Sequence, residues 1–210
     1  MKRIIAFILV LCILAPSVAF AKGSDGPFYT ERKNWKHEAW LWDELSMYSP
    51  NDYVTAAVLS YFWRESQYRS DAVAGYASSL TGYGIDLCKT ITEKTDEGLE
   101  DGSSRKYFLK KARWHGGYGL GQWYSMHYLE DLYDFARETG ATSIGDASMQ
   151  CEFIFYSLQK DEWLWKRLKN VEDASTAGYY IGKLYDGSGS AAEYMKYKAV
   201  KLYNKYHEES

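Results

Sequence analysis

An apolar repeat that ends at an acidic residue constrains this 210-residue chain more than any other feature of its sequence. Glu65 lies at i+11 of the repeat and, at about 100° per residue, returns to the same helix face. Charged residues on such a helix usually point to water, so a carboxyl group on this face needs an explanation. The apolar members follow helical spacing at i, i+3, i+4, i+7 and i+8: Val54, Ala57, Val58, Tyr61 and Phe62.

Placement of Glu65 on an apolar face is compatible with an acid–base role. A carboxyl group there loses hydration of its charged form, so its pKa rises. A carboxylic acid that stays protonated near neutral pH can donate its proton to a leaving oxygen, as the general acid does in glycoside cleavage. The alternative is a helix-end glutamate that forms a cap or an ion pair with Arg64 or Arg69. Periodicity alone leaves both interpretations open.

The rest of the chain is predicted to be mainly helical, with one irregular insert. Glycines, Ser, Thr and clustered charges from residue 70 to about 114 predict loops, with a small β-hairpin at Lys89–Thr95. Ser49-Pro50-Asn51-Asp52 predicts a turn and a helix cap. Besides the helix that carries Glu65, apolar spacing predicts helices over residues 31–48, 125–139, 148–160, 161–169, 174–185 and 190–206.

The N-terminus has the pattern of a signal peptide over residues 1–21. Lys2 and Arg3 precede a short apolar run, and Ala19-Phe20-Ala21 provides a small-x-small cleavage pattern. The alternative is an uncleaved anchor, although the run is short for crossing a bilayer. We therefore expect a flexible segment over residues 22–30 and a secreted, periplasmic or envelope protein without stable membrane insertion.

Charge and cysteine content limit the partners and the redox state. Loss of Lys2 and Arg3 would move the formal net charge from −3 to −5, which argues against nucleic acid as a partner. An acidic protein would need a shaped groove, rather than long-range attraction, to bind an anionic cell wall. Cys88 and Cys151 would remain after cleavage, and an even pair in an exported protein suggests a disulfide.

A glycine-rich run, Gly116 to Trp123, is the second informative motif. Glycines allow positive φ and close approach of another molecule to the backbone. Tyr118 and Trp123 offer flat faces that suit sugar rings, and the Gln122 amide can bond hydroxyl or acetamido groups. The alternative is a glycine turn packed under core aromatic residues. Phosphate binding is disfavoured, because no Lys-Ser or Lys-Thr follows the glycines.

Taken together, these motifs resemble the phage tail lysozyme family of the lysozyme-like superfamily, which is related to lytic transglycosylases. Glu65-Ser66-Gln67-Tyr68 is similar to the superfamily's Glu-Ser-x-aromatic motif, and Gly117 to Trp123 is similar to the family's Gly-Tyr-Gly-Leu-x-Gln-Trp motif. Residues 142–153 and Tyr185-Asp186-Gly187 resemble further family segments. The resemblance covers roughly residues 35–206 and implies a mainly α, α+β lysozyme-like catalytic domain over residues 31–210.

The resemblance implies roles for individual residues in the cutting of peptidoglycan glycan strands. It makes Glu65 the catalytic acid, places Tyr118 and Gln122 along the sugar groove, and puts Trp123 beside the groove or beneath it in the core. Ser66 is expected to orient Glu65 or to touch the substrate. The chain departs from the family in its predicted export signal, because phage tail lysozymes are usually parts of larger virion proteins.

Two mechanisms remain open within this resemblance. Hydrolysis needs a base or a positioned water opposite Glu65, whereas a lytic transglycosylase uses the substrate's own hydroxyl and yields an anhydro sugar. The long polar insert favours hydrolysis, that is, a muramidase. Its candidates for the second group or for substrate binding are Asp86, Thr92, Thr95 and Asp96.

Other classes of function fit less well. No His-x-x-x-His pair supports a metallopeptidase, and no metal or other cofactor is expected. A disulfide or buried thiols explain the cysteines more simply than a cysteine peptidase does. A non-catalytic wall-binding or assembly protein is the serious rival, although a binder has no need for an acid on an apolar face. An envelope apparatus is an additional candidate partner that the sequence does not identify.

Overall fold

The computed structural model describes residues 37–73, 82–187 and 189–208. The predicted signal peptide (1–21) and the segment 22–30 lie outside the described residues. In chain order, the helices of the described part are α1 (Glu38–Ser46), α2 (Asp52–Ser66), α3 (Gly82–Asp96), α4 (Arg105–Trp114), α5 (Met126–Glu138), α6 (Ala147–Gln159), α7 (Glu162–Lys169), α8 (Ala174–Tyr180), the π-helix η2 (Ile181–Tyr185) and α9 (Gly189–Glu208).

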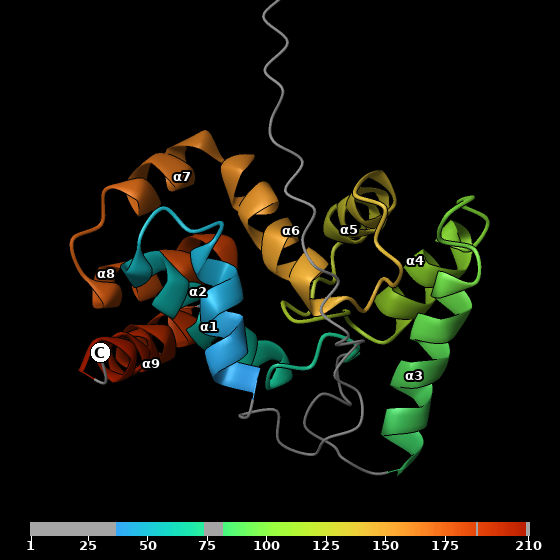
Figure 1. Cartoon of the computed structure of the whole chain (residues 1–210), viewed down its shortest axis with the longest axis horizontal. Helices are drawn as coiled ribbons and strands as arrows, with labels where there is room; N and C mark the ends of the chain where they lie inside the picture. The colour runs from blue at the N-terminus through green and yellow to red at the C-terminus, as the bar shows by residue number, and fades with distance from the viewer. Residues whose placement is uncertain (1–36, 74–81, 188, 209–210) are drawn as a thin grey trace, which may run out of the picture.

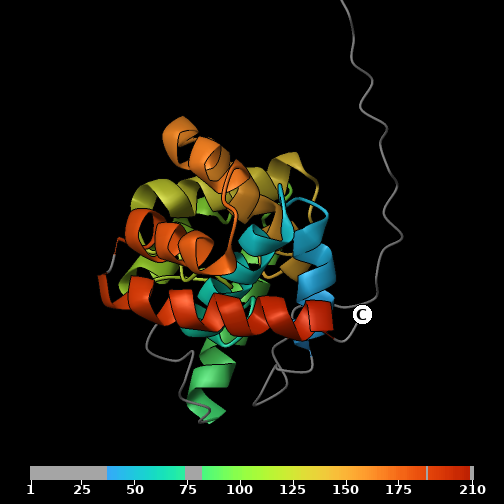
Figure 2. The same cartoon turned by 90° about the vertical axis from the view of Figure 1, so that its left-hand side faces the viewer.

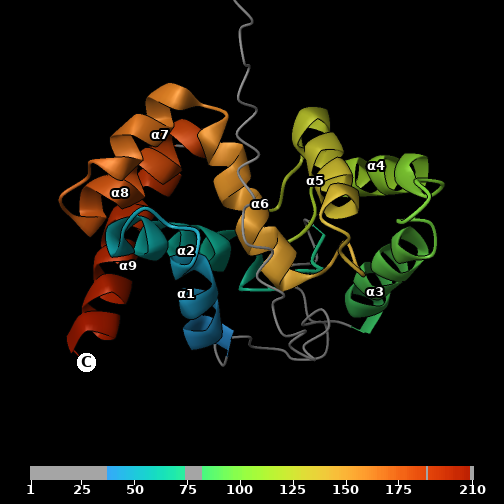
Figure 3. The ribbon, with the colours of Figure 1, turned by 45° about the horizontal axis from the view of Figure 1, so that its top comes forward.

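The helices form two groups that flank α6 (Figure 1). On one side α1, α2, α8 and α9 pack together, and on the other α4 packs against both α3 and α5. The turned view has the same arrangement, with α6 contacting α1 and α5 (Figure 3). From a third direction, α9 runs lengthwise across the near side of the molecule (Figure 2). The mainly α, lysozyme-like fold class predicted from the sequence is confirmed.

Helix α2 is the centre of the first group. The predicted apolar face is buried from Val54 to Phe62, and so are the residues between its members, which places the whole middle of the helix in the core. The Asn51 side chain accepts a hydrogen bond of 3.0 Å from the Val54 N–H, so the predicted cap is confirmed. At the other end, Gln67 adopts φ 53° and ends the helix just beyond Glu65.

The predicted β-hairpin at Lys89–Thr95 is wrong, because these residues belong to α3. Cys88, Ile91, Thr92 and Thr95 are all buried, and their spacing is helical. The two threonine hydroxyls donate to the carbonyls four residues back, at 3.1 Å and 2.7 Å, so both polar groups are satisfied inside the helix. No strand occurs among the described residues, where only the bridges Val73–Tyr118 and Tyr118–Trp123 are of β type.

The expected disulfide is also absent, because Cys88 and Cys151 are free thiols in this structure. Each is fully buried, Cys88 on α3 and Cys151 on α6. Burial raises the pKa of both thiols, which disfavours the reactive thiolate form. Both cysteines therefore act as small apolar side chains of the core.

The remaining predicted helices agree with α5 to α9 within a few residues. The predicted helix over 174–185 is composite, because α8 continues into the π-helix η2. Within the described ranges no helix is both long and apolar enough to span a membrane. Nor do three or more His, Cys, Asp or Glu side chains converge there in a way that could hold a metal ion.

Candidate active site

Glu65 lies in the last turn of α2, where its side chain is about 20 % exposed. Burial raises the pKa of this carboxyl group, and the nearby Asp186 carboxylate raises the pKa further. The positive charge of Arg64 and its hydrogen bond act in the opposite direction. The net direction is upward, as predicted from the apolar face of α2.

Arg64 links the two carboxyl groups of the site. Its Nη1 donates a short hydrogen bond to Glu65 Oε1 and lies 3.5 Å from Asp186 Oδ1. Glu65 is therefore both partly buried and paired with Arg64, and its acid–base role stays a prediction. Asp186 follows the π-helix η2, an element that often occurs at functional sites.

Glu65 and Asp186 line the same pocket, which has a volume of about 80 Å³. Its walls come from α2, from the end of the glycine-rich run, from the start of α5 and from the turn after η2. Tyr124 stands at this pocket with 66 % of its surface exposed, so an aromatic face is open to a ligand. The lining residues are Tyr61, Glu65, Gly121, Gln122, Trp123, Tyr124, Ser125, Tyr128, Tyr185 and Asp186.

The glycine-rich run is held against α2 as a tight loop. The backbone groups of Tyr118 and Trp123 exchange two hydrogen bonds of 3.1 Å, which closes the loop. The Tyr61 hydroxyl of α2 donates to the Gly121 carbonyl at 2.5 Å. A Cβ atom at Gly121 would lie 2.6 Å from the Trp123 ring, so only glycine fits there.

Gln122 occupies the pocket wall in a backbone conformation that is unusual for a side-chain-bearing residue, with φ 46°. Its Nε2 donates to the carbonyls of Ala72 and Gly119, at 2.9 Å and 2.8 Å. Its Oε1 is buried and has no hydrogen-bond partner among the described residues. The amide is therefore fixed by its donor side and retains an acceptor for a ligand.

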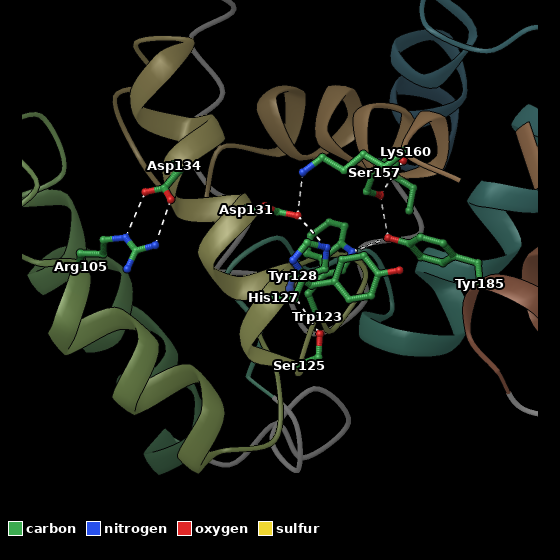
Figure 4. Close-up of polar contacts among 11 residues, drawn as sticks. Arg105, Trp123, Ser125, His127, Tyr128, Asp131, Asp134, Ser157, Lys160 and Tyr185 are labelled. Carbon is green, nitrogen blue, oxygen red and sulfur yellow. Dashed lines mark hydrogen bonds and ion pairs between the residues drawn. The ribbon is translucent and has the colours of Figure 1, made fainter. Parts of the chain in front are cut away.

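Trp123 is mostly a supporting residue of the core. It is 2 % exposed, and its Nε1 donates to the Tyr185 hydroxyl at 2.9 Å (Figure 4). The Tyr185 hydroxyl also shares a hydrogen bond of 2.8 Å with Ser157 of α6. This chain of contacts fixes Tyr185, and with it the turn that places Asp186 beside Arg64.

Three residues predicted at the sugar groove lie elsewhere. Tyr118 and Thr92 are buried and share a hydrogen bond of 2.6 Å, so this tyrosine is part of the core between α3 and the glycine-rich run. The Ser66 hydroxyl is buried and donates to the Phe62 carbonyl at 3.0 Å, within its own helix. None of the three lines the pocket that holds Glu65.

The other candidates in the insert do not reach Glu65 either. Asp86 is exposed on α3, and Thr95 is buried within it. Asp96 accepts hydrogen bonds from the Ser143 hydroxyl and the Ile144 N–H, at 2.7 Å and 2.8 Å, so it joins α3 to the loop before α6. Asp186 is the second carboxylate of the pocket instead. Its only sequence signal was the Tyr-Asp-Gly turn near the C-terminus.

Asp186→Asn is expected to lower the pKa of Glu65. The substitution removes a like charge that favours the protonated form and frees Arg64 to stabilise the carboxylate. The titration of the Glu65 side-chain carboxyl carbon by NMR should therefore move to lower pH. Arg64→Gln should have the opposite effect. It removes a positive charge, so the titration of Glu65 should move to higher pH. An unchanged midpoint in both variants would contradict the coupling.

The chain matches a family model described as phage tail lysozyme over residues 38–206. This match spans every helix of the described structure except the last residues of α9. Neither a curated protein nor a solved structure matches the chain.

Proposed function

The chain belongs to the phage tail lysozyme family, and we propose that it is a muramidase that hydrolyses the β-1,4 bond between N-acetylmuramic acid and N-acetylglucosamine. Family membership supports a lysozyme-like, peptidoglycan-degrading enzyme in general terms. The finer assignment of bond, mechanism and residues rests on the pocket. Its main support is the pairing of Glu65 with a second carboxylate, Asp186, in one partly buried site.

In the proposed reaction, Glu65 is the general acid. Its proton passes to the glycosidic oxygen as the bond from that oxygen to the anomeric carbon breaks, and the leaving sugar departs with a hydroxyl group. One water molecule adds its oxygen to the anomeric carbon, and its proton passes to a carboxylate of the site. The raised pKa of Glu65 keeps a larger share of the enzyme in the proton-donating form near neutral pH.

The remaining groups of the pocket are assigned to substrate binding and charge stabilisation. Asp186 is the candidate to hold the attacking water or to stabilise positive charge at the anomeric carbon. The unpartnered Oε1 of Gln122 can accept a hydrogen bond from a hydroxyl or acetamido N–H. Tyr124 offers an exposed ring for stacking against a sugar.

Product analysis tests this proposal directly. Purified sacculi are digested in water labelled with ¹⁸O, and the glycan ends are analysed by mass spectrometry. Hydrolysis should produce reducing muramic acid ends that each carry one labelled oxygen. Anhydro ends without label would identify a lytic transglycosylase, which needs no second carboxylate. A folded protein that binds sacculi and releases no ends would be a wall-binding protein.

Export and location are further parts of the proposal. The N-terminal pattern favours a secreted, periplasmic or envelope-associated enzyme, with peptidoglycan strands as its partner and without stable insertion in the membrane. An apparatus that delivers or holds the enzyme is compatible with the same proposal.

A further inference from the structure

A basic groove lies along α4 and reaches the start of α5. It has a volume of about 570 Å³ and is separate from the pocket that holds Glu65. Leu109 and Met126 give it apolar surface, and most of its other lining residues are cationic. We call it the α4 groove, and it is lined by Gly102, Ser103, Arg105, Lys106, Leu109, Lys110, Arg113 and Met126.

The described residues neutralise only part of the positive charge of the α4 groove. Helix α4 contains no acidic residue. Lys106, Lys110 and Arg113 are exposed, and none forms a hydrogen bond or ion pair with another described residue. Arg105 differs, because it donates two hydrogen bonds to Asp134 of α5 (Figure 4). Three free cations around one groove, in a chain of net negative charge, therefore form a local attraction for anions.

The groove adjoins the candidate active site through the start of α5. Ser125 caps α5 and lines the pocket of Glu65, whereas the next residue, Met126, lines the α4 groove. In Figure 4, Arg105 and Tyr185 lie on opposite sides of α5. The pocket and the α4 groove therefore meet at the start of α5, so a polymer held in the pocket lies next to the groove.

We infer that the α4 groove binds the free carboxylates of the stem peptides that branch from the glycan strand. This inference rests on the proposed function, since it assigns a second part of the same substrate. The glycan sugars themselves carry no charge once their lactyl groups are joined to peptides, so the carboxylates of the peptides are the complementary groups. Leu109 and Met126 suit the aliphatic parts of such peptides. The groove would select strands that still carry their peptides.

A binding experiment tests the inference in a background that leaves the substrate intact. Glu65→Gln protein is sedimented with intact sacculi or with chitin, an insoluble peptide-free glycan that also lacks the lactyl carboxylates. The test variant adds Lys106→Gln and Lys110→Gln. The matched control adds Lys169→Gln and Lys201→Gln, which removes the same charge from exposed positions on α7 and α9.

The test variant should bind intact sacculi about fivefold more weakly than the control at low salt, as expected for two exposed ion pairs. The difference should disappear on peptide-free glycan and shrink near about 1 M salt. Equal binding of both variants to intact sacculi, or an equal loss on peptide-free glycan, would overturn the inference. Failure of the wild type to cut glycan would instead overturn the proposed function. The two failures are distinguishable, because the comparison of binding by the test and control variants does not depend on cleavage.

Discussion

Replacement of Glu65 by Gln is expected to lower the rate of glycan cleavage about a thousandfold, which corresponds to roughly 4 kcal/mol of barrier. The amide keeps the size of the side chain and can still accept a hydrogen bond from Arg64, but it has no proton to give to the leaving oxygen. The rate of release of glycan ends from sacculi measures the effect. Glu138→Gln, on the exposed end of α5, is the matched control and should retain full activity.

The stability of the Glu65→Gln variant separates a catalytic effect from a folding effect. A carboxyl group with a raised pKa in the folded state stabilises the protein only while it is protonated, and this contribution is lost as pH rises through that pKa. Glutamine is neutral at every pH, so the variant should be at least as stable as the wild type at neutral pH. Near-wild-type activity in a folded variant would exclude Glu65 as the acid.

The position of Glu65 could be predicted because the information is local. Helical spacing from Val54 to Phe62 fixes which side of α2 faces the core, and Glu65 falls on that side by periodicity. The cap at Asn51 is equally local, since its side chain bonds the Val54 N–H three residues later. Short-range signals of this kind depend on one helix and need no knowledge of its neighbours.

The role of Tyr118 could not be predicted, because the same residue type serves two purposes. A tyrosine in a glycine-rich run can stack on a sugar or fill a core, and the choice depends on what covers it. Here Thr92 and Phe108 cover it, and both come from helices of an insert whose sequence predicts loops. The sequence contains the helical spacing of Cys88, Ile91, Thr92 and Thr95, but its alternation of Thr and Ile also predicts a strand.

Asp186 shows the limit of sequence analysis for the site itself. Two long-range contacts hold it near Glu65. Arg64 of α2 lies against Asp186 itself, and Trp123 holds the neighbouring Tyr185. Each link joins segments that are distant in sequence, so neither spacing nor composition predicts the pair. In the sequence, only the Tyr-Asp-Gly turn marks this part of the chain.

Gln150 also joins segments that are distant in sequence. Its replacement by Met should lower the free energy of unfolding by roughly 3 kcal/mol or more. This side chain is fully buried on α6 and joins three backbone segments. Its Nε2 donates to the carbonyls of Ser70 and Ile144, and its Oε1 accepts from the Leu120 N–H, each at 2.8 Å. Methionine has a similar size, so the loss would come from three buried backbone groups left without partners rather than from a cavity.

Urea denaturation measures the loss, and Gln159→Met at the exposed end of α6 is the control, with an expected change within about 0.5 kcal/mol. Because Gln150 bonds both the segment after Glu65 and the glycine-rich run, the variant should also loosen the pocket. We therefore expect weaker glycan cleavage even under conditions where the variant stays folded. A Gln150→Met protein as stable as the control would mean that water or a shifted backbone replaces all three hydrogen bonds, and that the amide does not hold the two motifs together.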